Sequence, residues 1–296
     1  MFDRIMKKSF ILIAAIALVA TACDSSTTEQ KIEAYDNALD EIMTSYRTRV
    51  QEIDLDESYI INGTASEEYA KAAENAENSL IALTTRTVRK NPSDTIALYA
   101  LQVAANYVTG YEKLEPAVRA VKGEIAGDEF VRLLGEQIEI LKRTAEGSKF
   151  VDFTVETFIG DDADGEPQFS KASLSDYVGR GKYVLVDFWS PWCAPCKRAI
   201  PALKDIYDKY HGEDFDMLSV AVWEESRNMN YRNTVDTAAV YGINWNTINN
   251  GHLEPAALYG IEAIPYLILF GPDGTILKKN PSSAELIGLI GSTLGR

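Results

Sequence analysis

The chain has 296 residues, enough for two domains that each bury a core of their own. Hydrophobic residues make up 46% of it and charged residues 25%, which is typical of globular proteins. The formal net charge of −15 argues against nucleic-acid binding, because the surplus of Asp and Glu leaves no basic stripe to neutralise phosphates. We therefore expect no nucleic-acid partner.

The N-terminus predicts a signal peptide over residues 1–22. Met6-Lys7-Lys8 is basic, and the apolar run 10–20 is too short to span a bilayer. The run ends in Ala20-Thr21-Ala22-Cys23, which resembles a lipobox, the signal for lipidation of the Cys that begins the mature protein. We expect lipidation at Cys23, a tether over 23–30 and attachment to a membrane. A general secretory signal whose cleavage site happens to lie near a Cys is the alternative.

Helical periodicity predicts an all-α domain over residues 31–147. Apolar residues recur every three or four positions from Ile32 to Ile53, and the pattern resumes after each break. This domain could be a simple helical bundle or a module that docks a client, and the sequence leaves both open. The helices are expected at 32–53, 67–88, 95–110, 114–121 and 128–143.

A boundary at Gly147-Ser148 precedes an α/β pattern, and residues 148–296 predict a mixed sheet flanked by helices. The acidic turn 161–165 is expected to be a solvated hairpin tip. An insertion over 245–260 carries Trp245 and His252. Strands are expected at 150–159, 166–171, 183–189, 214–223, 266–270 and 275–279, and helices at 174–178, from the C-x-x-C onward, at 226–241 and at 284–294.

Residues 183–201 carry the chemistry. An apolar strand interrupted only by Asp187 leads into Cys193-Ala194-Pro195-Cys196 at the start of a helix. Unpaired N–H groups and the helix dipole favour a thiolate there, and can lower a Cys pKa from about 8.5 into the range ~3.5–7.5. A zinc site would need two more ligands, and Cys23, His211 and His252 form no second pair. We predict redox chemistry, with no metal and no cofactor beyond the Cys193–Cys196 dithiol.

The stretch Val186-Asp-Phe-Trp-x-x-Trp-Cys-x-Pro-Cys-Lys197 resembles the active site of thioredoxins, and Pro201 matches their helix-kinking proline. With the segments 150–154 and 260–270, residues 149–296 are similar to the TlpA/ResA-like family. Those proteins are membrane-tethered thiol–disulfide oxidoreductases of the bacterial envelope. The resemblance implies a thioredoxin fold, a periplasmic position on a membrane, disulfide-bearing client proteins and a membrane electron donor for re-reduction.

Roles follow for the residues of the motif. Cys193 is expected to be the more exposed cysteine and the attacking thiol, and Cys196 to resolve the mixed disulfide. The resemblance implies that Pro265 is the cis-proline facing the dithiol and that the Ile264 backbone binds an extended client segment. Trp192, Ala194 and Pro195 are expected to contact the client as well.

Asp187 matches the buried acid of thioredoxins and is expected to take the proton of Cys196. The Glu that many relatives place two residues before the helix proline is Ala199 here, and the strand 215–223 holds no Lys to accompany the acid. A carboxyl group buried without a cation should have a raised pKa.

The Ala-Pro dipeptide between the cysteines and the Ile before the cis-proline resemble reducing members of the family more than oxidants. We expect a reductase or exchange enzyme. A peroxiredoxin-like thiol peroxidase would need a Thr-x-x-Cys setting, which Ser190-Pro191-Trp192-Cys193 lacks. A copper-delivery protein would need a His or Met cluster near the C-x-x-C. Both remain alternatives.

Overall fold

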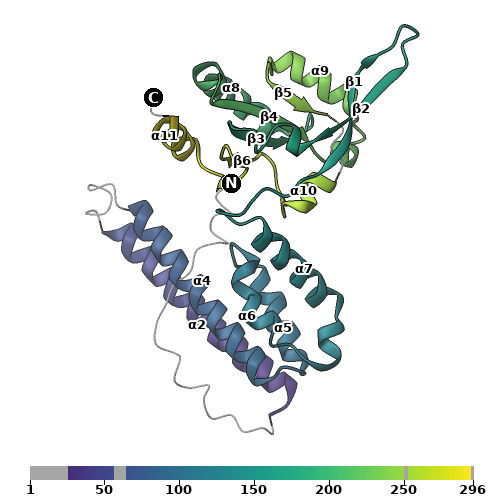
Figure 1. The fold of residues 1–296 in the computed structure, drawn as a ribbon. Coiled ribbons are helices and arrows are strands. Elements are labelled where there is room, and N and C mark those ends of the chain that lie inside the picture. The colour runs from purple at the N-terminus through teal and green to yellow at the C-terminus, as the bar shows by residue number, and fades with distance from the viewer. Residues whose placement is uncertain (1–25, 57–64, 250–252, 295–296) are drawn as a thin grey trace. The chain divides into compact units, whose positions relative to one another are not determined.

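The computed structural model describes residues 26–56, 65–249 and 253–294 (Figure 1). The chain forms two compact units that divide between Glu139 and Ile140, inside the last helix of the first unit. The boundary predicted at 147–148 lies just after that helix ends. The predicted signal peptide and residues 23–25 of the predicted tether, Cys23 included, fall outside the described residues. The prediction of a tether as far as residue 30 is wrong at its end, because the first helix begins at Thr28, capped by Thr27.

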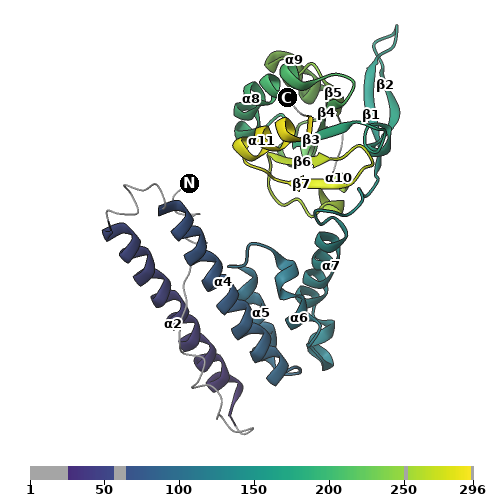
Figure 2. The same ribbon diagram turned by 60° about the vertical axis from the view of Figure 1, so that its left-hand side comes forward.

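The first unit is built of helices, as the periodicity predicts. Tyr35 ties three of them together, because its buried hydroxyl bonds Thr84 at 2.9 Å and donates to the carbonyl of Ala100 at 3.3 Å. Figure 2 shows the first two long helices lying along each other. The helices are α2 (Thr28–Leu55), α4 (Ala65–Lys90), α5 (Thr95–Ala105), α6 (Glu115–Val118) and α7 (Glu129–Arg143), with 3-10 turns at Tyr111–Leu114 and Gly123–Gly127.

Helix α5 ends at Ala105, earlier than the prediction of about Gly110. The N–H and hydroxyl of Thr109 both donate to Glu77 of α4, so the chain there is held by a side chain instead of the helical ladder. Within the described segments, no helix combines the length and apolarity needed to cross a membrane.

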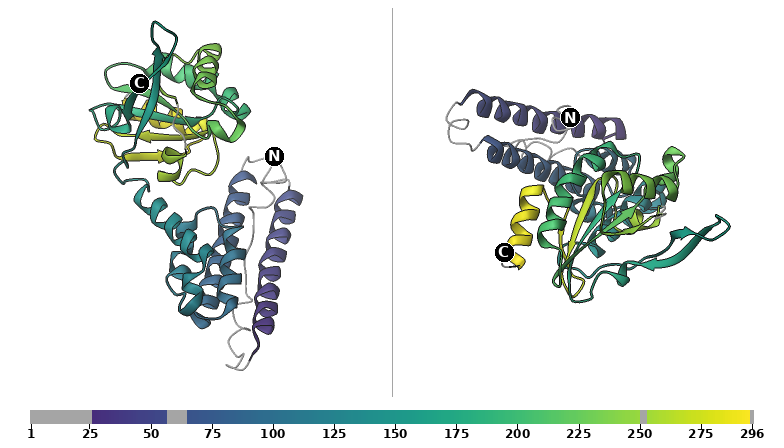
Figure 3. Two further views of the ribbon diagram at one scale, coloured as in Figure 1. Left: turned by 90° about the vertical axis from the view of Figure 1, so that its right-hand side faces the viewer. Right: turned by 90° about the horizontal axis from the view of Figure 1, so that it is seen from above.

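The second unit contains a five-stranded mixed sheet of order β5-β4-β3-β6-β7 and a separate antiparallel hairpin, β1–β2, which projects from it (Figure 3). Strand β3 pairs in parallel with β4 and antiparallel with β6. The elements are β1 (Thr154–Asp161), β2 (Pro167–Ser173), β3 (Tyr183–Trp189), α8 (Ala194–Tyr210), β4 (Phe215–Ala221), α9 (Tyr231–Tyr241), β5 (Asn246–Ile248), α10 (Glu254–Leu258), β6 (Tyr266–Phe270), β7 (Ile276–Lys279) and α11 (Ser283–Leu294), with 3-10 turns at Leu174–Asp176 and Glu224–Arg227.

The two faces of the sheet bury different clusters, because side chains alternate along each strand. On one face, Val184, Val186 and Phe188 of β3 join a core that includes Tyr259. On the other face, Leu185 packs with residues of α8 and α11. Position 187 therefore faces the side of the sheet that α8 covers.

Several boundaries differ from the predictions. Strand β1 begins at Thr154 instead of residue 150, and α9 begins at Tyr231 instead of residue 226. A 3-10 turn occupies Glu224–Arg227, and Asn228, in the left-handed conformation, stops it before Asn230 caps α9. The insertion after Trp245 contains an unpredicted edge strand, β5, which pairs in parallel with β4.

Candidate active site

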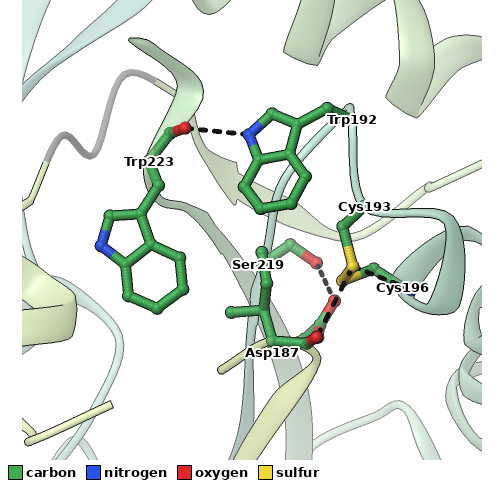
Figure 4. The surroundings of a disulfide bond; sticks show 7 residues. Asp187, Trp192, Cys193, Cys196, Ser219 and Trp223 are labelled. Atoms are coloured by element: carbon green, nitrogen blue, oxygen red, sulfur yellow. Dashed lines mark hydrogen bonds between the residues drawn. A yellow bond between two sulfur atoms is a disulfide. The ribbon is translucent and has the colours of Figure 1, made fainter. Parts of the chain in front are cut away.

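The two cysteines lie at the start of α8, just after the loop that connects it to β3. Cys193 is the N-cap of α8, and its Sγ accepts a hydrogen bond from the N–H of Cys196 at 3.1 Å. The two cysteines form a disulfide bond (Figure 4). An N–H aimed at the Cys193 sulfur, at the positive end of a helix, stabilises negative charge on that atom when the bond is reduced.

Both cysteines are buried. Cys193 is 2% exposed and Cys196 3%, so the expectation that Cys193 is the more accessible one is wrong. Both pack against Trp189, with Ile264 and Ile243 partly buried around them. Neighbouring side chains cover the helix terminus and remove the difference in exposure that position on the helix would otherwise give. Any preference between the two thiols must therefore come from electrostatics.

The Ile264–Pro265 peptide bond is cis, as the resemblance implies. The carbonyl oxygen of Ile264 lies 3.7 Å from the Cys193 Sγ, so this loop forms a wall of the site directly beside the sulfur. Ile264 and Pro265 are half-buried, whereas Ala194 and Pro195 are exposed on the helix. These four residues therefore lie around the dithiol: Pro265 as the predicted cis-proline, and Ile264, Ala194 and Pro195 as three of the residues predicted to contact the client.

Trp192 forms a second wall. Its indole Nε1 donates to the carbonyl of Trp223 at 2.9 Å (Figure 4), and the guanidinium of Arg227 lies 5.7 Å from its ring centroid. Trp223 has a φ of 56°, a left-handed conformation that is rare for a bulky residue. Sequence analysis missed Trp223 and Arg227, since neither stands in a recognisable motif.

Asp187 is the acid of the site. It is 2% exposed, and burial raises the pKa of its carboxyl to about 7, with the hydrogen bond from Ser219 acting in the opposite direction. The burial and the raised pKa confirm what the sequence predicts for this position. The Ser219 hydroxyl lies 3.3 Å from Oδ2, while Oδ1 is buried and has no hydrogen-bond partner among the described residues.

Ser219 belongs to the site and was not singled out from the sequence. It is fully buried opposite Asp187 in the parallel β3–β4 register, and its Oγ accepts a bond of 2.8 Å from the Nε1 of Trp245. A signal did exist, because Ser219 interrupts the apolar end of the predicted strand 214–223. Of the two side chains named in the insertion, Trp245 is packed in the core, and His252 lies outside the described residues.

In the part of the chain that the structure describes, no group of three or more His, Cys, Asp or Glu side chains is arranged to hold a metal ion. The groups that the described residues do bring to the site are the two cysteines, the buried carboxyl group of Asp187 and the carbonyl of Ile264.

Comparisons with known proteins place residues 147–279 in a match to the AhpC/TSA family model. The thiol-disulfide oxidoreductase ResA of Geobacillus thermodenitrificans (strain NG80-2) is 27% identical over 128 residues, which cover 43% of this chain and 67% of that protein. The protein of the same name from Bacillus subtilis (strain 168) is 26% identical over 134 residues, covering 45% and 66%. The match thus spans about two thirds of the length of these relatives.

The crystal structure of a thioredoxin-like protein from Bacteroides caccae ATCC 43185 is similar over 95% of this chain and 97% of that one, with a TM-score of 0.50 and 17% identity. At that identity the likeness concerns the fold alone. It confirms the predicted thioredoxin-like sheet domain preceded by a helical region.

The raised pKa of Asp187 makes a prediction about stability. An unfolded Asp titrates near 3.9 and the folded one near 7, so between these values the folded state keeps a proton that the unfolded state has released. The contribution of Asp187 to the free energy of unfolding therefore falls as the pH rises toward 7. Asp187→Asn, which cannot ionise, should gain stability relative to wild type between pH 5.5 and pH 8 by roughly 2 kcal/mol.

Urea denaturation of both oxidised proteins at these two pH values measures this gain, and both values avoid the sequence pI of about 4.7. Asp164→Asn, which removes the same charge from the exposed hairpin tip, is the control and should show no such gain. A stability difference between Asp187→Asn and wild type that does not change with pH would contradict the raised pKa.

Proposed function

We propose that the C-terminal unit, a thioredoxin-like domain similar to the ResA proteins, makes this protein a thiol–disulfide oxidoreductase that reduces or exchanges disulfides in client proteins. The observation that carries the proposal is the placement of Cys193. Its sulfur caps α8, accepts the N–H of Cys196 and stands beside the Ile264 carbonyl before a cis-proline. The helix terminus and the Cys196 N–H stabilise a nucleophilic thiolate. The Ile264 backbone is suited to pairing with an extended client segment.

The first step is attack on the client. The Cys193 thiolate, stabilised by the Cys196 N–H and the helix terminus, attacks one sulfur of the client disulfide. The client S–S bond breaks, a mixed disulfide forms on Cys193, and the other client sulfur leaves as a thiolate. Ile264, with Trp192, Ala194 and Pro195, would contact the client segment at this stage.

The second step resolves the mixed disulfide. The Cys196 thiol gives its proton to Asp187, and the resulting thiolate attacks the Cys193 sulfur. The Cys193–client bond breaks, the second client thiolate leaves, and the Cys193–Cys196 disulfide remains, which is the state that the structure holds. Asp187 suits this role because it is buried on the α8 side of the sheet and burial brings its pKa to about 7.

Each turnover leaves the protein oxidised by two electrons, so a donor must return two electrons and two protons to the disulfide. We propose that this donor is a membrane protein and that the chain works as a reductase. The Ala194-Pro195 dipeptide and Ile264 before the cis-proline support that direction by resemblance.

We further propose that the protein is held on an envelope membrane, facing the periplasm, by lipid on Cys23. The support is the sequence Ala20-Thr21-Ala22-Cys23 after a basic and then apolar segment. Several acyl chains would give a stable anchor, whereas a single myristoyl chain binds only at ~10⁴ M⁻¹.

The cysteine roles can be tested by insulin reduction and thiol alkylation. Cys193→Ser should abolish turnover, and Cys196→Ser should also stop it but accumulate a mixed disulfide with the substrate. In the reduced wild type, Cys193 should be alkylated much faster than Cys196 near pH 7, because the N-cap environment favours its thiolate. Faster alkylation of Cys196, or full turnover by Cys193→Ser, would reverse the assignment. Parallel assays of peroxide reduction and copper binding by the wild type separate the two alternative functions from this one.

The proposed base can be tested with Asp187→Asn. Loss of one general base should slow resolution of the mixed disulfide by ~10²-fold or less. The rate of Cys193 alkylation should stay nearly unchanged, because Asp187 acts on the other thiol. Single-turnover kinetics measured from pH 6 to 9 report both steps. Wild-type resolution by the variant across this range would exclude Asp187 as the base.

The anchor can be tested by Cys23→Ser. Wild type should sediment with membranes and carry lipid mass on its N-terminal peptide, and the variant should lose both properties. A wild-type protein that is free of membranes and has an unlipidated N-terminus would rule out the anchor.

A further inference from the structure

A three-residue hydrogen-bond chain joins the insertion to the buried acid. Trp245 precedes β5, Ser219 lies in β4 and Asp187 in β3, so adjacent strands supply the last two members. Trp245 is 6% exposed and both other residues are buried, so water does not compete with the protein groups at any link. Figure 4 shows the Ser219 and Asp187 side chains joined by their hydrogen bond.

The chemistry of the indole fixes the direction of the chain. Trp245 Nε1 can only donate, so the Ser219 Oγ must accept at the 2.8 Å contact. The single hydroxyl proton of Ser219 is then left for Asp187, whose Oδ2 lies 3.3 Å away. A reversed bond, from a protonated Oδ2 to Ser219, would leave the serine proton buried without an acceptor.

The two oxygens of Asp187 are therefore not equivalent. Oδ2 accepts the serine hydroxyl, whereas Oδ1 is buried and accepts no hydrogen bond from any residue that the structure describes. Asp187 shares its face of β3 with Leu185 and Trp189. Leu185 belongs to an apolar cluster that includes Ile200 of α8, and Trp189 to one that includes both cysteines. The unpartnered oxygen thus belongs to a carboxyl group on the face of the sheet that α8 covers.

We propose that Ser219, held in orientation by Trp245, is a positioning residue of the resolution step: it donates to Oδ2 of Asp187 and leaves Oδ1 to receive the proton of Cys196. In that step the Cys196 S–H bond breaks, its electron pair stays on sulfur, and the proton forms an O–H bond on Oδ1. The proposal rests on the proposed oxidoreductase function.

The Ser219 hydrogen bond is the interaction that lowers the pKa of Asp187. The two cysteines stand at the start of α8, which covers this face of the sheet, while β4 presents Ser219 and β6 presents Leu267 opposite position 187. Among the described residues, no charged side chain contributes to the pKa of Asp187. Burial raises it and the Ser219 hydrogen bond alone lowers it. Removing that bond should therefore raise the pKa of Asp187 further.

The test is a titration of the Asp187 carboxyl carbon by NMR in the full-length protein labelled with ¹³C-aspartate, alongside the pH profile of resolution. Ser219→Ala should raise the pKa of Asp187 by about one unit and move the rising limb of the resolution profile by the same amount. Ser219→Thr, which keeps a hydroxyl, should restore both. Ser190→Ala is the matched control, because it removes a buried hydroxyl that has no hydrogen-bond partner in the described part of the chain, and it should move neither.

A second arm uses Trp245→Phe, which keeps an aromatic ring in the core but removes the donor to Ser219. It should raise the pKa of Asp187 by less than Ser219→Ala does. In an Asp187→Asn background, Ser219→Ala should leave the resolution profile unchanged.

An unmoved Asp187 titration in Ser219→Ala, failure of Thr to restore it, or a persistent Ser219 effect in the Asp187→Asn background would each overturn the proposal. The titration needs no turnover, so failure of the oxidoreductase function would be seen separately, as a wild type that does not reduce insulin.

Discussion

The parallel pairing of β3 with β4 is the constraint on which the site depends. Its register sets Asp187 against Ser219, and the next bond beyond the strands, from the Val222 N–H to the Trp189 carbonyl, extends the ladder. Because β4 is held beside β3 at this point, the carbonyl of Trp223, one residue further on, can accept the hydrogen bond from Trp192 Nε1. A shift of one residue would turn Ser219 to the opposite face of the sheet, since side chains alternate. Acid, hydroxyl and tryptophan wall are thus consequences of a single strand register.

The burial of both cysteines changes how selectivity between them must arise. Exposed fractions of 2% and 3% give the two cysteines nearly equal solvent accessibility, but their hydrogen-bond environments differ. The Cys193 sulfur accepts an N–H at the start of α8, whereas Cys196 is the residue that supplies that N–H from within the helix. A low local dielectric strengthens such a bond to a charged acceptor. Exclusion of water therefore favours the Cys193 thiolate without making it more accessible.

The sequence predicted the bounds of those strands whose local pattern agrees with their packing. The strands Tyr183–Trp189 and Tyr266–Phe270 have the predicted bounds, because an apolar run in the middle of a sheet is bounded by turn residues on both sides. Strand β5 was missed since it has three residues and is defined by its partner β4 instead of its own composition. The exposure of Cys193 was misjudged because Ile264, far along the chain, helps cover it. Although Ser219 interrupts an apolar strand, its place at the site follows from its register opposite Asp187, a pairing that one sequence does not display.

The substitution of a hydroxyl for a cation beside the buried acid has a calculable effect on proton transfer. A thiol at its reference pKa of about 8.5 would lose roughly 6 kcal/mol in protonating a carboxylate whose pKa is about 3.9. With Asp187 near 7, the same transfer costs about 2 kcal/mol. A lysine at position 219 would stabilise the carboxylate and restore much of the larger cost, because an adjacent cation lowers an acid's pKa. A serine hydroxyl offsets only part of the desolvation, so the carboxyl group can both accept a proton from Cys196 and release it again at neutral pH.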